Sequence, residues 1–292
     1  MHSVLAGHVE SLTIVDLHSP DEEYADDNPN KVLRIVADVT KPIEQHLESA
    51  LASAELVICA LPEDALVGAL PQLIATVPKG ALAVDTASVK SPLAALWSST
   101  GPSILSINPM FAPSLSPAGR CVLAVSAGRP GRQDEFLKLL QRNGMVVVRL
   151  TDADEHDRLT AVLQAGVHAA TLAYGLTIAG AGFGAQQVAQ LAPPPCHQQL
   201  MLLARMVAQP PEVYEDIQRS NPHAEQVRAD LIQNMARIGQ LATTKNLDSA
   251  LSYVADWLGS ARVPLAEHCQ NVYDELATSS DRRIAGSAGP DA

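Results

Sequence analysis

The strongest constraint on the fold of this chain is a change of pattern near residue 150. Before that point, short and nearly continuous apolar runs such as Glu55–Ala60 and Ala81–Asp85 alternate with segments of helical periodicity. Apolar strands separated by helices are typical of a mostly parallel sheet covered on both faces. From Thr151 onward only helical periodicity remains. The sequence therefore predicts an α/β, Rossmann-like domain followed by an all-helical domain.

The expected elements can be placed by residue. The predicted strands are Ser11–Asp16, Val32–Ala37, Glu55–Ala60, Ala81–Asp85, Ser103–Ile107, Cys121–Ser126 and Val146–Leu150. The predicted helices are Ile43–Ala52, Asp64–Ile74, Ser91–Ser98, Asp154–Ala179 (capped by Thr151 or Asp152), a helix after Pro193–Pro195 ending near Val207, a short one containing Tyr214, one from Asn221 to about Leu241, Leu247–Leu258 and Ala266–Leu276. We predict domains at residues 1–150 and 151–277, and a disordered tail at 278–292 because that segment is rich in Ser, Gly, Asp and Arg.

Composition excludes several partners. The 292 residues are 47% hydrophobic, enough to bury two cores, and the formal net charge of −12 repels phosphate backbones and anionic lipid. We therefore expect no nucleic-acid or membrane partner. Independently of the charge, we expect no apolar run that is long enough to span a bilayer. The four cysteines form no C-x-x-C pair, which argues against a metal site or a disulfide framework and favours the cytoplasm.

One carboxylate stands where a dinucleotide-binding domain needs it. Asp16 ends a predicted strand, the position from which a carboxylate holds the adenosine ribose of NAD, although an ordinary loop aspartate fits there too. The strand and G-x-G-x-x-G turn that normally precede it are missing, and Met1–His8 looks like the end of the helix that follows such a turn. Either the start codon is placed too late or the loop has been lost. Gly180–Gly184 follows helical periodicity with the wrong spacing, which indicates a helix end or loop.

More specific signals come from motifs in a fixed order. These are Asp85–Lys90, Asn108–Pro113, Glu155–Asp157 continuing to Gln164 and His168–Gly175, and Ala204–Tyr214. Together they resemble the prephenate dehydrogenase family, whose members convert prephenate to 4-hydroxyphenylpyruvate, over roughly Leu12 to Leu276. The resemblance implies NAD as cofactor, a small dianionic substrate and a homodimer formed through the helical domain.

In the first domain, the resemblance implies roles for four residues. Leu61 and Pro62 match the loop that lies along the cofactor. Ser88 matches the active-site serine beside the reacting centre and the cofactor; alternatively it caps the helix that begins near Ser91. Lys90 either supplies positive charge to the substrate site or is an exposed surface lysine.

In the helical domain, Arg205 matches the arginine that holds the substrate carboxylate, with a structural ion pair as the alternative. Gln164 and His168 lie one helical turn apart and by resemblance point into the substrate cleft, although a lone helix histidine is often structural. His197 lies two turns before Arg205 and is expected to share its pocket.

The main departure from the family is at Asn108. The family usually has His-Pro-Met-Phe-Gly-Pro, and that histidine is its general base; here the sequence is Asn-Pro-Met-Phe-Ala-Pro. An amide cannot accept the proton of a 4-hydroxyl group. This favours 4-amino-4-deoxyprephenate, whose amine needs no base as hydride leaves, giving 4-aminophenylpyruvate. Two alternatives stay open: a prephenate dehydrogenase in which His168 or a water held by Ser88 replaces the base, and a binding or regulatory protein that has lost catalysis.

Overall fold

The computed structural model describes residues 5, 8–18, 31–97, 101–112, 114–128 and 130–280. The chain divides into two compact units. The first comprises Met1–Ala161 together with Arg219–His223, and the second comprises Val162–Gln218 and Ala224–Ala292. Part of the predicted helix end at Met1–His8 lies outside the described residues.

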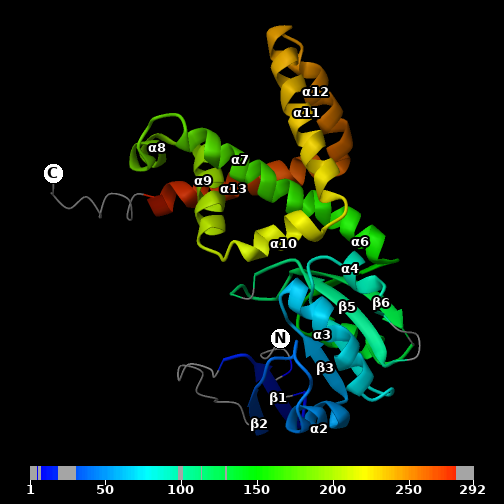
Figure 1. The fold of residues 1–292 in the computed structure, drawn as a ribbon. Helices are drawn as coiled ribbons and strands as arrows, with labels where there is room; N and C mark the ends of the chain where they lie inside the picture. Colours follow the sequence, from blue (N-terminus) through cyan, green and yellow to red (C-terminus); the bar gives the residue numbers. More distant parts are fainter. Residues whose placement is uncertain are drawn as a thin grey trace, which may run out of the picture. The chain divides into compact units, whose positions relative to one another are not determined.

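The first unit contains two sheets. Strands β1 (Ser11–Asp16) and β2 (Lys31–Val36) pair in parallel. The second sheet has five strands in the order β3 (Leu56–Cys59), β4 (Leu82–Asp85), β5 (Ser103–Pro109), β6 (Cys121–Gly128) and β7 (Val146–Leu150). Every pairing is parallel except that of β5 with β6. Figure 1 labels β3, β5 and β6 of this sheet. The predicted mostly parallel sheet is confirmed, and the seven predicted strands are all present.

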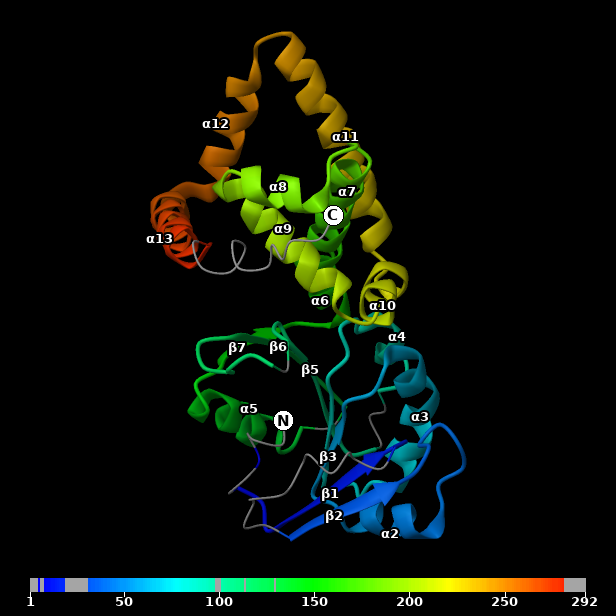
Figure 2. The same ribbon diagram turned by 90° about the vertical axis from the view of Figure 1, so that its left-hand side faces the viewer.

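Helices cover the five-stranded sheet on both faces (Figure 2). On one face, α2 (Gln45–Ser53) and α3 (Glu63–Thr76) pack against Ala83 and Ile104, and short α4 (Ser91–Ala94) follows β4. On the other face, α5 (Gln133–Arg142) packs against Leu82 and Val84. Neighbouring strand residues thus enter opposite cores, as the two-residue period of a strand requires. Helix α5 was not predicted.

Helix α6 (Ala153–Thr160) begins with a side-chain cap, since Asp152 accepts a hydrogen bond from the Glu155 backbone N–H at 2.9 Å. Of the two predicted caps, Asp152 is therefore correct. The single predicted helix is interrupted by a π-helical turn at Ala161–Gly166 before α7 (Val167–Ala179) continues. Because α6 packs against β6, β7 and α4, the first compact unit extends to Ala161 rather than ending at residue 150.

The second unit is entirely helical among the residues described. Its further helices are α8 (Ala185–Leu191), α9 (Pro194–Val207), α10 (Glu212–Ser220, whose last two residues belong to the first unit), α11 (Ala224–Thr243), α12 (Leu247–Leu258) and α13 (Arg262–Ser280). Gly175 allows close packing of α7 on α9, because a Cβ there would lie 2.6 Å from a Leu203 methyl carbon. Gly180 ends α7, so the glycine cluster is an interhelical turn, as predicted.

Two expectations about this unit need correction. Helix α13 continues to Ser280, so residues 278–280 are helical rather than tail; 281–292 lie outside the described residues. The run Ala153–Ala179 is long enough to cross a membrane, and an 18-residue window within it has a mean hydropathy of 1.3, so the expectation that no run has this length and composition was wrong. After Arg158 the run contains no Asp, Glu, Lys or Arg. Length and composition alone are weak evidence for a span, since core helices pass the same test.

Candidate active site

A buried cation lies beneath the carboxyl ends of β4 and β5. Lys90 is fully buried, which rules out the exposed surface lysine considered above. Its Nζ donates to the carbonyl oxygens of Ala87 and Ile107, both at 2.7 Å, and to Asp85 Oδ1 at 3.2 Å. These three bonds use all three N–H groups of the ammonium. Burial lowers the pKa of Lys90, and the neighbouring Asp85 carboxylate opposes that shift.

The loop after β4, which carries Ser88, is held by carboxylates from two helices. Glu63 at the start of α3 accepts from the Val89 backbone N–H at 2.7 Å. Asp157 on α6 accepts from the Lys90 N–H at 2.8 Å and the Ser91 N–H at 2.7 Å. Asp157 therefore satisfies the backbone donors at the start of α4, whose N-cap is Lys90. Ser88 does not have the alternative role of capping that helix, and it lies half-buried in the loop.

Asn108, at the end of β5, contacts a buried histidine. The amide is 2% exposed, and its Nδ2 lies 3.2 Å from His156 Nε2. The opposite ring nitrogen, His156 Nδ1, lies 2.8 Å from Asp157 Oδ1, and both His156 and Asp157 are fully buried. A chain of hydrogen bonds thus joins Asn108, His156 and Asp157.

The charge states in this chain follow from its surroundings. Burial lowers the pKa of His156, and nearby Lys90 lowers it further, although Asp157 acts in the opposite direction. Burial alone would raise the pKa of Asp157, but hydrogen bonds from His156, Ser91 and Lys90 outweigh it and the pKa is lowered. At neutral pH the pair is therefore a neutral imidazole beside a carboxylate.

Asp85 is a further buried carboxylate at the end of β4. Its Oδ1 accepts from Ser106 Oγ at 2.7 Å and from the Ala87 N–H at 3.3 Å, in addition to Lys90. Its Oδ2 has no hydrogen-bond partner among the described residues. An unpartnered buried oxygen at this edge of a parallel sheet, where ligands of such folds bind, fits a site that is completed by a bound molecule.

The three other residues predicted to contact a cofactor lie at strand ends of the same unit. Asp16 ends β1 with its side chain exposed, and its Oδ1 accepts from the His18 N–H at 3.0 Å. Leu61 and Pro62 follow β3, half-buried and exposed respectively. An exposed carboxylate at a strand end matches the chemistry of a ribose-binding residue. Among the described residues, no glycine-rich turn between a strand and a helix precedes β1.

In the second unit, His168 on α7 packs edge-to-face against Tyr214 of α10, with ring centroids 4.9 Å apart. Its Nδ1 is buried and has no hydrogen-bond partner in the described part of the chain. Burial lowers the pKa of His168, so the ring is neutral at pH 7 and can accept a proton. Gln164 is half-buried in the π-helical turn just before α7.

Arg205 and His197 share helix α9, which packs against α7. Arg205 is exposed and lies in the last turn, while His197 is half-buried near the first. Arg205 makes no hydrogen bond or ion pair with any residue that the structure describes, so the alternative of a structural ion pair has no partner there. The guanidinium remains available to a carboxylate.

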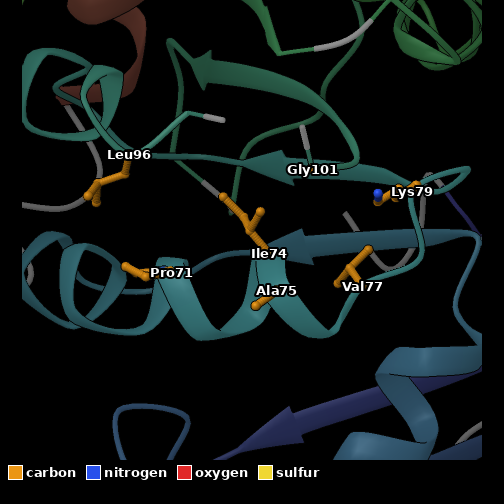
Figure 3. Close-up of a pocket in the computed structure, with 7 residues that line it drawn as sticks. All are labelled: Pro71, Ile74, Ala75, Val77, Lys79, Leu96 and Gly101. Atoms are coloured by element: carbon orange, nitrogen blue, oxygen red, sulfur yellow. The ribbon is translucent and has the colours of Figure 1, made fainter. Parts of the chain in front are cut away.

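A surface hollow of about 380 Å³ lies beside α3 (Figure 3). Its lining is Pro71, Ile74, Ala75, Val77, Lys79, Leu96 and Gly101. It contains none of the predicted site residues and no acid–base pair. The chemistry of the strand ends, rather than this hollow, defines the candidate site.

Sequence reasoning missed His156, Asp157, Glu63 and Asp85 as parts of the site. Glu155–Asp157 was noticed as a motif, but no roles were assigned to its residues. The available signal was the pair of adjacent ionisable residues in the first turns of the helix predicted at Asp154–Ala179. Their partners are 48 and 67 residues away in the chain, so periodicity could not have identified the contacts.

Known proteins resemble this chain over most of its length. A family model described as prephenate dehydrogenase, dimerization domain, matches residues 152–256. A 4-amino-4-deoxyprephenate dehydrogenase from Streptomyces pristinaespiralis is 35% identical over 250 residues, covering 84% of each chain. A T-protein from Enterobacter agglomerans is 34% identical over 175 residues, which are 58% of this chain and 46% of that protein.

A solved structure agrees with the fold. The prephenate dehydrogenase from A. aeolicus in complex with hydroxyphenyl propionate and NAD+ superposes with a TM-score of 0.63 at 12% identity, covering 89% of this chain and 98% of that one. The fold combines a Rossmann-like domain with a helical domain, and the protein is an oxidoreductase of the prephenate dehydrogenase type. The chain belongs to the prephenate dehydrogenase family.

Proposed function

We propose that this protein catalyses the NAD-dependent oxidative decarboxylation of 4-amino-4-deoxyprephenate to 4-aminophenylpyruvate. The observation that carries the proposal is the amide of Asn108, held at the end of β5 by a neutral histidine. An amide can orient a substrate but cannot take its proton. The relative from Streptomyces pristinaespiralis, which carries the name of this activity, supports the same substrate.

The chemistry of the substrate explains why an amide suffices. A nicotinamide cofactor held by Asp16, Leu61 and Pro62 would supply the acceptor for the hydride that leaves C4 of the ring. The lone pair of the 4-amino group pushes in as that hydride leaves, which gives an iminium ion without loss of a proton. The bond between the ring and its carboxylate then breaks and releases CO₂. The electron pair of that bond enters the ring, which makes the ring aromatic and restores the neutral amine. The side-chain carbonyl oxygen of Asn108 accepts a hydrogen bond from an N–H of the amine and thereby orients the lone pair of the amine nitrogen.

The remaining predicted residues bind and position. Asp16 holds the adenosine ribose and favours NAD over NADP, whose additional phosphate it repels; Leu61 and Pro62 lie along the cofactor, and Ser88 lies beside the reacting centre. Arg205 binds a substrate carboxylate, with His197 in the same pocket, and Gln164 and His168 face the substrate. Because Lys90 uses its three N–H groups internally, its role is to supply positive charge from beneath the site rather than to touch the substrate.

A second candidate substrate is prephenate itself. His168 supports it, because a neutral imidazole with an unpartnered buried nitrogen can act as a general base in place of the missing histidine. We further propose that the protein is a cytoplasmic homodimer.

The substitution Asn108→His tests the substrate assignment. A histidine restores a base that titrates near neutrality, so turnover of prephenate should rise by about 10²–10⁴-fold. The gain should follow a pH profile with a midpoint near the histidine pKa, and turnover of the amino substrate should stay level or fall. Both substrates are assayed with NAD and with NADP.

Asn108→Gln is the matched control, because it keeps the amide but offers no base. The proposal fails if the parent protein turns over prephenate much faster than the amino substrate and the histidine variant gains nothing. In that case prephenate becomes the assigned substrate and His168 the candidate base. Lack of turnover of both substrates would instead favour a binding role.

A further inference from the structure

The His156 ring has only one tautomer that satisfies both of its contacts. Ionised Asp157 can only accept hydrogen bonds, and its Oδ1 lies 2.8 Å from Nδ1. Nδ1 must therefore carry the proton of the neutral ring. Nε2 is then left with a lone pair and can act only as an acceptor.

The tautomer decides which way the Asn108 amide faces. The Asn108 atom 3.2 Å from His156 Nε2 has to be a donor, so it is the amide nitrogen rather than the amide oxygen. In the opposite orientation, the carbonyl oxygen would face the lone pair of Nε2, and two acceptors would meet in a fully buried position. With Nδ2 bound to the histidine, Oδ1 is on the other side of the amide group.

The histidine is itself firmly held. Asp157 is fixed by three donors, namely the backbone N–H groups of Lys90 and Ser91 and the His156 ring. Asn221 Nδ2 donates to the Asp157 backbone oxygen at 2.8 Å and to Thr160 Oγ1 at 3.2 Å, which secures the same turn of α6. The orientation of the amide thus follows from contacts that come from three separate segments, namely residues 90–91, helix α6 and Asn221.

We propose that His156, oriented by Asp157, is a positioning residue that holds the Asn108 amide with its carbonyl oxygen, rather than its NH₂, turned toward the substituent at C4 of the substrate. This inference rests on the proposed function. A carbonyl oxygen accepts an N–H from the 4-amino group and leaves the nitrogen lone pair free. A reversed amide would donate to that lone pair and withdraw the electrons that must push the hydride out. His156 therefore contributes to the choice between the amino and hydroxyl substrates without contacting either.

A first experiment measures the tautomer without any assay. Protein labelled with ¹⁵N and ¹³C in its histidines, of which there are nine, gives ring nitrogen shifts that distinguish the two tautomers. The His156→Gln variant identifies the His156 signal by its loss. We expect a protonated Nδ1 and a bare Nε2 at pH 7. A proton found on Nε2 would overturn the proposal, whatever the enzyme turns over.

A second experiment is a double-mutant cycle on selectivity, the ratio of kcat/KM for the amino substrate to that for prephenate. His156→Leu should lower this ratio about tenfold in the Asn108 parent, the size of one hydrogen bond, and should leave it unchanged in an Asn108→Ala background. If His156 only stabilised the fold, His156→Leu would change kcat/KM for both substrates alike, and it would do so in both backgrounds. That outcome would contradict the proposal.

The conservative variant guards against a folding failure. In His156→Gln, the side-chain NH₂ can donate to Asp157 while the oxygen accepts from Asn108, so most of the selectivity should return. His223→Gln is the matched control, because His223 also contacts a carboxylate at 2.8 Å, that of Asp154, but at the surface. Equal selectivity in the His156→Leu and His156→Gln variants would refute the positioning role. If the parent prefers prephenate, the proposed function fails by itself, and the tautomer measurement still decides the orientation.

Discussion

At the scale of single residues, Arg205 offers the clearest test of the substrate site. If its guanidinium binds a substrate carboxylate, Arg205→Ala should raise KM by at least about 30-fold, because a charge-assisted bidentate pair is lost. The KM of Arg205→Lys should fall between those of the parent protein and Arg205→Ala, since an ammonium keeps the charge but lacks the planar geometry of the guanidinium. Steady-state kinetics on the preferred substrate measures both.

Arg237→Ala on α11 is a suitable control, since Arg237 is also exposed on a helix of the second unit. It should leave KM unchanged. A change below about threefold in Arg205→Ala would mean that Arg205 has no part in binding and that the substrate pocket has been misassigned.

Individual side chains also show where sequence reasoning stops. Asn108 could be recognised because it replaces a histidine within a motif, and its position at the end of β5 agrees with the predicted strand. The burial of Lys90 could not be foreseen, because its acceptors are Asp85 and two carbonyl oxygens that only the folded loop brings together. A lone charged residue in a sequence does not reveal whether the fold supplies partners for it.

At the scale of elements, strands were easier to predict than helix detail. Runs such as Leu82–Asp85 are buried on both faces and carry a continuous apolar signal. Helix α5 was missed because it is short and mostly polar; Phe136, Leu137 and Leu140 are its buried apolar residues, and Leu139 packs partly buried against the same core. The π-helical turn at Ala161–Gly166 has no composition of its own and could not be read from periodicity.

The start of α6 leads to a prediction at this scale. Asp152→Ala removes the acceptor for the Glu155 N–H and should lower the free energy of unfolding by about 1 kcal/mol, with a melting temperature about 2–4 °C lower. Asp152→Asn keeps a cap oxygen and should cost much less. Thermal unfolding followed by circular dichroism would reveal the difference. Equal losses in the two variants would show that the charge, rather than the cap hydrogen bond, stabilises the helix.

At the scale of the whole molecule, the second unit carries large apolar side chains that are exposed on several of its helices. Ile232 on α11 is 73% exposed and Trp257 on α12 is 78% exposed, and Leu176 on α7 is 67% exposed. The family model that matches residues 152–256 is that of a dimerization domain, and it spans all of α7 and α11 and most of α12. A second copy of the chain would cover these faces and also account for the apolar character of Ala153–Ala179.

Light scattering coupled to size exclusion should therefore give a mass near twice 30.9 kDa at micromolar concentration. Trp257→Glu places a charge on the exposed face of α12 and should shift the mass toward that of one chain, because an unpaired charge is costly to bury in an interface. Val146→Glu on β7, a residue that is also exposed but lies in the first unit, should leave the mass unchanged. A parent protein with a mass near 30.9 kDa would refute the dimer. A partner of different chemistry would then have to cover these helices.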